Sequence, residues 1–218
     1  TFAVAATAQP AAVRKGGLRS RMTGRRLQIV DVMVGPETID VPTFRGGGQV
    51  QLNEHGRIMK DNTYGNMEED AMRRDFTCNA LYYDPVRQKI VDFHDGVADI
   101  RARRLVMIGN PAARYQEDPV RIWRAVRLSG KLGFEVDDAT AEPIHGYAGR
   151  LKQEPVARLF DEIMKLLFSG HARQCLKQLY KLGVDADIHP LLTALQQSGQ
   201  HKQQNIVALA LNNTDERL

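Results

Sequence analysis

One short stretch, residues 73–80, combines side-chain types that suit nucleotide binding. It reads Arg-Arg-Asp-Phe-Thr-Cys-Asn-Ala. Arginine contacts phosphates in a bidentate manner, while Asp and Asn can hydrogen-bond to ribose hydroxyls. The stretch is therefore suited to nucleotide binding by Arg74, Asp75 and Asn79. The simpler alternative is a structural Arg–Asp pair at the start of a helix that Thr77 caps.

A second stretch, Glu117–Leu132, carries basic residues along one side of an expected helix. Its apolar side is formed at helical spacing by Ile122, Ala125, Val126, Ser129 and Leu132. Gly133 is a typical helix terminator. The basic stripe consists of Arg121, Arg124, Arg127 and Lys131. Such a stripe is usually solvated, and contact with a nucleotide or RNA is the alternative. Trp123, the only tryptophan, is expected in the core.

The composition is that of an ordinary globular protein. Of 218 residues, 43% are hydrophobic and 26% are charged. The net charge of +4 mildly favours a polyanionic partner. Cys78 and Cys175 are too few for a disulfide framework or a zinc site, so a reducing compartment is expected. No apolar run is long enough to span a bilayer, and no membrane partner is expected.

The expected elements divide the chain into an α/β part of about 110 residues and an all-helical part. Leu27–Val34 and Thr38–Phe44 alternate like strands around a turn, which predicts a hairpin. The polar stretch 46–62 is expected to be a loop. From Asn66 onward the pattern is helical, interrupted by a short strand at Gln88–Phe93. Further helices are expected at 156–167, 175–182, 190–197 and near the C-terminus.

Residues 73–80 resemble the nucleotide-binding motif of the bacterial-type poly(A) polymerases and CCA-adding enzymes, which are class II nucleotidyltransferases. These enzymes add nucleotides to RNA ends with two metal ions held by carboxylates. The resemblance implies that Arg74, Asp75 and Asn79 position the ribose and phosphates of the incoming nucleotide.

Two later segments extend this resemblance. Residues 117–127 resemble the family's base-recognition helix, which implies that Asp118 and Arg121 read the base edge and that Arg124 belongs to the same site. Residues 158–162, Arg-Leu-Phe-Asp-Glu, resemble the neck helix and favour the poly(A) polymerase branch. Residues 92–100 resemble a family segment expected to be a structural turn, with His94 as an exposed loop residue.

The metal-binding positions depart from the family pattern. Residues 1–15 match the Asp-Phe-Asp-Val line of poly(A) polymerases without a gap, and this alignment puts Thr1 and Ala3 at the two Asp positions. The third carboxylate position falls on Asp40. One carboxylate and a hydroxyl make a poor magnesium site, because hard cations prefer several charged oxygens. We therefore expect no bound metal.

The resemblance implies an α+β fold: a nucleotidyltransferase-like head at residues 1–110 and a helical neck at residues 111–218. The Gly-Gly-x-Val-Arg-Asp segment expected upstream is absent, so the head is expected to lack its first strands. A catalytically inactive, RNA-binding relative of poly(A) polymerase follows as the preferred interpretation. It would act within a ribonucleoprotein such as an organellar ribosome, with other proteins as partners and the mitochondrial matrix as a possible compartment.

Two alternatives stay open, an active RNA nucleotidyltransferase that uses Mg²⁺ and ATP, and a nucleotide sensor without turnover. For RNA contact, the expected residues are Arg14, Lys15, Arg19, Arg21, Arg25, Arg26 and Arg127. Phosphate contacts by such residues would make RNA affinity fall steeply with salt.

Overall fold

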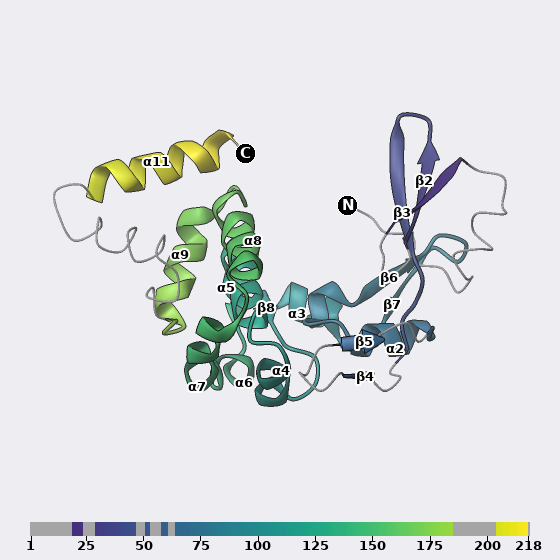
Figure 1. The fold of residues 1–218 in the computed structure, drawn as a ribbon, viewed down its shortest axis with the longest axis horizontal. Helices are drawn as coiled ribbons and strands as arrows, with labels where there is room; N and C mark the ends of the chain where they lie inside the picture. The colour runs from purple at the N-terminus through teal and green to yellow at the C-terminus, as the bar shows by residue number, and fades with distance from the viewer. Residues whose placement is uncertain are drawn as a thin grey trace. The chain divides into compact units, whose positions relative to one another are not determined.

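The computed structural model describes residues 19–23, 29–46, 51–52, 58–60, 64–184 and 204–217. The chain forms two compact units, Thr1–Arg74 and Asp75–Leu218, and Figure 1 labels most of their helices and strands. Residue 110, where the sequence suggested the end of the head, lies inside the second unit. No helix in these described ranges is long and apolar enough to cross a membrane.

The first unit contains a three-stranded antiparallel sheet in the order β1-β2-β3. Its strands are β1 (Ser20–Thr23), β2 (Ile29–Val34) and β3 (Glu37–Pro42). The predicted β2–β3 hairpin is confirmed, and Gly35 supplies the left-handed backbone that its tight turn requires, with φ of 61°. Val30, Val32 and Val41 form a small core on one face of the sheet. Strand β1 was not predicted, because its sequence is dominated by basic and polar residues.

The polar stretch 46–62 was predicted to be a loop, but it contains the paired strands β4 (Gln51–Leu52) and β5 (Ile58–Lys60). Strands this short give no period that a sequence pattern can show. Helix α2 (Met67–Met72) follows. It begins at a capping box in which Asn66 and Glu69 exchange hydrogen bonds between side chain and backbone.

The second unit opens with the 3₁₀ helix η1 (Thr77–Asn79), the hairpin β6 (Leu81–Asp84) and β7 (Lys89–Asp92), and α3 (Gly96–Arg101). Strand β7 was predicted, whereas β6 was wrongly read as helical. Asp92 accepts hydrogen bonds from three backbone amides at the start of α3, which confirms a structural turn. His94 in this turn is half-buried and not exposed as predicted.

The helix predicted at residues 117–132 begins only at Arg121, as α5 (Arg121–Leu132), while Glu117 is the last residue of the preceding helix α4 (Pro111–Glu117). The break lies at Asp118, whose φ of −147° and ψ of 92° are extended. A residue before proline is disfavoured in the helical region, because the proline ring clashes with its backbone. Pro119 therefore explains the break. Gly133 ends α5 with φ of 65°, as predicted.

A short parallel pair, β8 (Arg104–Leu105) and β9 (Glu135–Val136), flanks these helices. Next come α6 (Asp138–Ala141), α7 (Ile144–Ala148), η2 (Gly149–Gln153), α8 (Val156–Leu167) and α9 (Ala172–Lys181). Helix α11 (Gln204–Arg217) is the last described element. The predicted α8, α9 and C-terminal helix are confirmed, while the helix predicted at 190–197 lies outside the described residues.

The core of the second unit is built around α5. Trp123 is 1% exposed, which confirms its predicted place, whereas Leu132 is 43% exposed and does not belong to the buried face. Helix α9 crosses α5 closely at Gly130, where an added Cβ would lie 2.5 Å from the Cα of Cys175. Small sheets followed by packed helices confirm the α+β class.

Candidate nucleotide-binding site

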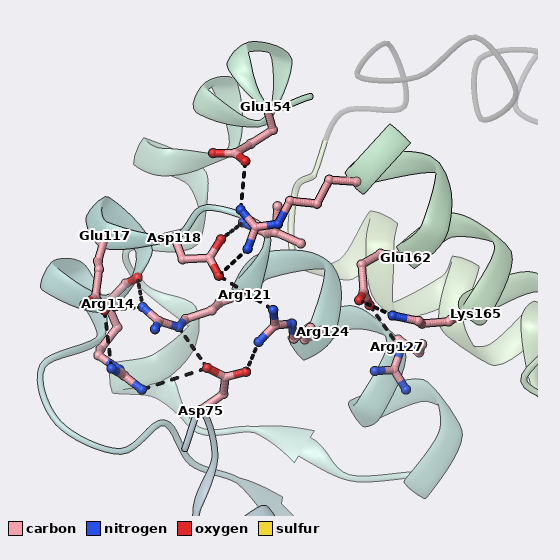
Figure 2. Close-up of polar contacts among 12 residues, drawn as sticks. Asp75, Arg114, Glu117, Asp118, Arg121, Arg124, Arg127, Glu154, Glu162 and Lys165 are labelled. Carbon is pink, nitrogen blue, oxygen red and sulfur yellow. Dashed lines mark hydrogen bonds and ion pairs between the residues drawn. The ribbon is translucent and has the colours of Figure 1, made fainter. Parts of the chain in front are cut away.

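Asp75 is the centre of the candidate site. Two contacts hold its backbone in place. The carbonyl of Asp75 accepts a hydrogen bond from the amide of Ile108 at 3.0 Å, and the next residue, Phe76, is fully buried in the core. The carboxylate projects towards three arginines of α4 and α5, as Figure 2 shows. Its side chain is 15% exposed.

Arg121 lies deepest among these arginines, with 11% of its side chain exposed. Its Nε donates to Oδ1 of Asp75 at 2.8 Å, and its Nη1 donates to Glu117 at 2.5 Å and to the carbonyl of Arg114 at 2.7 Å. Arg114 itself lies 3.3 Å from Glu117 and 3.9 Å from Asp75. The guanidinium of Arg121 is therefore held from two directions and has little room to turn.

Arg124 completes the shell, because its Nη1 donates to the second oxygen of Asp75. Burial alone would raise the pKa of Asp75, but the charges and hydrogen bonds of Arg124 and Arg121 outweigh it and hold that pKa below its ordinary value. Burial likewise opposes the charge of Arg124, yet Asp75 raises the pKa of that guanidinium. Asp75 is therefore fully ionised at neutral pH.

Asp118, at the break between α4 and α5, also has partners for its carboxylate within the protein. Its Oδ1 accepts from the amide of Val120 at 3.1 Å. Its Oδ2 accepts from Nη2 of Arg158 at 2.8 Å and lies 3.6 Å from Arg124. Arg158 also donates to Glu154 at 2.9 Å. Both oxygens of Asp118 thus have intramolecular partners.

The whole cluster balances its charges. Its four guanidinium groups belong to Arg114, Arg121, Arg124 and Arg158, and its four carboxylates belong to Asp75, Glu117, Asp118 and Glu154. A triphosphate can gain attraction here only by displacing carboxylates from arginines. The site as it stands holds its own side chains in place and presents no net positive charge.

Arg127 belongs to a separate pair further along α5. Its Nε lies 3.6 Å from Oε2 of Glu162, and Lys165 donates to the other oxygen of Glu162 at 2.9 Å (Figure 2). Glu162 is 7% exposed. Arg121, Arg124 and Arg127 of the predicted stripe are thus ion-paired, so the expectation that the stripe is solvated is wrong for these three residues. The fourth residue of the stripe, Lys131, is exposed as expected.

Two further residues were predicted to bind the nucleotide. Asn79 is exposed in η1. Arg74 belongs to the first unit, where its Nη2 donates to Asp70 at 2.6 Å. Thr77 does not cap a helix, as the simpler alternative would require; its hydroxyl donates to the buried carboxylate of Asp99 at 2.9 Å. Within the second unit, the structure groups Asp75, Asp118, Arg121 and Arg124.

The predicted metal and RNA residues are placed only in part. Asp40 is exposed on β3, in register with Asp31 of β2. Arg19 and Arg21 are also exposed at β1. Outside the described residues lie Thr1, Ala3, Arg14, Lys15, Arg25 and Arg26. Within the described ranges, no three His, Cys, Asp or Glu side chains are grouped to hold a metal.

Sequence reasoning assigned no role to four members of the network, Arg114, Glu117, Glu154 and Arg158. Arg114 and Glu117 precede the motif on α4, and their spacing of seven and four residues from Arg121 would have placed them on one side of a continuous helix. Arg158 stood in a recognised segment but had no assigned role. No local signal shows that it reaches Asp118, since the two are 40 positions apart.

Comparison with known proteins finds relatives along the whole chain. The family model described as the poly A polymerase head domain matches residues 2–106, and the model described as a probable RNA- and SrmB-binding site of polymerase A matches residues 133–195. Poly(A) polymerase I of Salmonella typhi is 39% identical over 100% of this chain and 49% of its own length. The CCA-adding enzyme of Lactobacillus helveticus is 31% identical over 85% of this chain and 46% of its own length.

A solved structure supports the same relationship. The Bacillus stearothermophilus CCA-adding enzyme, determined in complex with CTP, superposes with a TM-score of 0.74 at 30% identity, over 89% of this chain and 46% of that one. The fold and the sequence are those of a class II nucleotidyltransferase head followed by a helical neck. The chain belongs to the poly(A) polymerase and CCA-adding enzyme family. It spans about half the length of the curated relatives named above.

Proposed function

We propose that this chain is an RNA-binding member of the family that does not itself transfer nucleotides. The observation that carries the proposal is the residue set at the metal positions. Thr1 and Ala3 stand where the family places two aspartates, and Asp40 is the one carboxylate of the three. Two-metal transfer requires charged oxygens that clamp both ions.

The donor set does not fit a pair of magnesium ions. Alanine has no ligating atom, and a threonine hydroxyl is neutral. The nearest described carboxylate in the sheet register is Asp31, and its Oδ1 already accepts from the hydroxyl of Thr23 at 3.1 Å. A hard divalent cation takes six or more oxygen ligands, of which the protein normally supplies several as carboxylates.

The ion-pair network supports a weakened nucleotide site as well. Asp118 and Arg121, the pair that the resemblance assigns to base reading, both form hydrogen bonds within the protein. A base edge would compete with Arg158 for Asp118 and with Glu117 for Arg121. Because such charge-assisted bonds are stronger than neutral ones, binding of a nucleotide would cost part of this network.

RNA is the proposed partner on two grounds. The match to a family model described as a probable RNA-binding site covers η2, α8 and α9, and the net charge is +4. We also propose that other proteins of a ribonucleoprotein assembly, in a reducing compartment such as the mitochondrial matrix, surround the chain. Two features of the sequence support RNA binding without turnover. The chain still matches the family models, while Thr1 and Ala3 replace two metal-binding carboxylates.

Equilibrium binding tests the RNA part of the proposal. Fluorescence anisotropy of a labelled 12-nucleotide oligo(A) should show binding at 50 mM salt that weakens steeply as salt rises, because bound phosphates release counterions. Neutral dextran of similar mass serves as an unlabelled competitor and should have no effect. Absence of binding at 50 mM salt would refute an RNA-binding role.

A further inference from the structure

We propose that the exposed face of α9 binds single-stranded RNA, with its lysines on successive phosphates and Tyr180 stacked on a base. This inference rests on the RNA partner of the proposed function and adds the surface that contacts it. The α9 basic face is defined by Arg173, Lys177, Tyr180 and Lys181, all of them exposed. The face lies within the second unit, and α9 is labelled in Figure 1.

Helix α9 is basic along its own length. Its sequence, ARQCLKQLYK, contains three cations and no acidic residue. The side facing the core is apolar and consists of Ala172, Cys175, Leu176 and Leu179. The cations recur every four residues on the other side, so that they follow one another at intervals of about 6 Å along the helix. A row of cations at that spacing suits the backbone of an extended strand.

The cations of this face do not form buried ion pairs, whereas the arginines of α5 do. Lys177 has no ion-pair partner in the part of the chain that the structure describes. Lys181 pairs with Glu135, but the two side chains are 57% and 69% exposed. Exposed pairs of this kind contribute little and can be exchanged for a phosphate. The guanidinium of Arg173 donates to the neutral Oδ1 of Asn212 at 3.3 Å and is ion-paired with no carboxylate among the described residues.

Acidic residues of α11 bound the face at one end. Asp215 accepts from the amides of Ala172 at 2.8 Å and Arg173 at 3.3 Å, and thereby caps α9 from outside the helix. A polar hollow of about 320 Å³ between α9 and α11 includes Asp215 and Glu216 in its lining as well as Lys177. Their charge disfavours a phosphate inside the hollow, which assigns the RNA to the half of α9 that carries Tyr180 and Lys181, with Lys177 at the edge shared with the hollow.

Tyr180 supplies what a purely ionic surface lacks. Its side chain is 49% exposed between the two lysines. An aromatic ring among cations is the combination that single-strand binders use, because every base has a face that can stack. Beyond the end of α9, Gly183 lies beside the imidazole of His145 of α7, and α7 carries Tyr147, whose ring centroid is 5.3 Å from the guanidinium of Arg150.

The test compares RNA binding by the 218-residue chain and by substituted chains, using labelled 12-nucleotide oligo(A). Lys177→Glu should weaken binding about fivefold to tenfold at 100 mM salt, and Lys177→Gln should reduce the slope of log K against log salt by about 0.7. Tyr180→Leu should weaken binding at least about fivefold, while Tyr180→Phe, which keeps the ring, should bind within about twofold of the parent.

Lys89→Glu is the matched control, because Lys89 is an exposed lysine of β7 and receives the same change of charge. It should bind oligo(A) within about twofold of the parent, because the changed charge can act on the RNA only through screened long-range electrostatics. Thermal melting verifies that every variant folds, which is expected since the substituted side chains are exposed.

The outcomes separate this inference from the proposed function. If the parent binds oligo(A) while Lys177→Glu and Tyr180→Leu bind equally well, the α9 surface is wrong and RNA binding stands. If Lys89→Glu weakens binding as much as Lys177→Glu, the effect is net charge and the α9 surface is again wrong. If the parent binds no oligo(A) at low salt, both proposals fall.

Discussion

Removal of the charge at Asp75 is the perturbation that the ion-pair network makes most informative. In Asp75→Asn, the guanidinium groups of Arg121 and Arg124 keep their charge but lose their common carboxylate. These side chains are 11% and 30% exposed, and Asp75 is 15% exposed. The substitution therefore leaves two clustered, largely buried cations whose remaining carboxylate partners are Glu117 for Arg121 and Asp118 for Arg124.

The expected loss follows from burial and hydrogen bonding. Removing one partner of a fully buried ion pair costs about 3–5 kcal/mol. Asp75 retains some contact with water, and asparagine can still accept one hydrogen bond, so we expect a loss of about 3 kcal/mol in the free energy of unfolding. At about 2–4 °C per kcal/mol for a domain of this size, the melting temperature should fall by roughly 6–12 °C.

The assay is urea unfolding followed by tryptophan fluorescence. Trp123, the only tryptophan, is 1% exposed in α5 next to Arg124, so its emission reports on the second unit. Asp161→Asn is the matched control, because Asp161 is exposed on α8 and undergoes the same chemical change. It should alter the free energy of unfolding by less than about 0.5 kcal/mol.

The pH dependence gives an independent check on the same residue. Because the folded pKa of Asp75 lies below its ordinary value of 3.8, the ionised carboxylate stabilises the fold at pH values above 3.8. That stability is lost as pH falls through the folded pKa. The difference between parent and Asp75→Asn should therefore be constant from pH 8 to about pH 5 and shrink below about pH 4. Equal unfolding curves for Asp75→Asn and Asp161→Asn at pH 7 would refute the reasoning.

Three further outcomes are expected. Gly130→Ala should destabilise the second unit by about 1–3 kcal/mol in the same urea assay, since its Cβ would lie 2.5 Å from the backbone of Cys175; an unchanged midpoint would contradict the close crossing of α5 and α9. Thr77→Val should cost about 1–2 kcal/mol, because the buried Asp99 loses a donor at 2.9 Å, and a neutral result would contradict that contact. Calorimetry should show ATP binding no tighter than roughly millimolar, about −4 kcal/mol; micromolar affinity would favour a nucleotide sensor.

The elements that sequence could predict are those in which local pattern and tertiary packing agree. The β2–β3 hairpin has alternating residues on either side of a Gly-Pro turn, and α8 and α9 have apolar residues at helical spacing, so each was found. Glycines 133 and 183 end helices with positive φ, as such glycines usually do. In these segments one neighbourhood of the sequence contains the whole physical reason for the structure.

Elements formed by distant pairing were missed. Strands β8 and β9 have two residues each and exist because they pair with one another across α4 and α5. Helix α5 was predicted to start at Glu117, but it starts at Arg121. The helical spacing of apolar residues suggested a longer helix, although Pro119 disfavours a helical backbone at Asp118. A period of 3.6 residues shows which positions share a face, and it does not show where one helix stops and another begins.

The candidate site was predictable as a set of residues but not as a network. Asp75, Asp118 and Arg121 were recognised from two motifs separated by about 40 positions, and the structure places them within one cluster. No motif indicated that Arg158 donates to Asp118 or that Arg121 donates to Glu117. Partners of this kind are set by the packing of α4, α5 and α8 on one another. The compartment and the protein partners stay predictions.

The central claim is that the chain binds RNA and transfers no nucleotide, and primer extension tests it most directly. A 5′-labelled oligo(A) primer, bound to excess chain at low salt, is incubated with ATP and either magnesium or manganese, and the products are resolved on a denaturing gel. The account predicts that the primer keeps its length at every time point, because Thr1 and Ala3 cannot replace the carboxylates of a two-metal site. A ladder of longer products that requires metal and disappears in Asp40→Ala would contradict it.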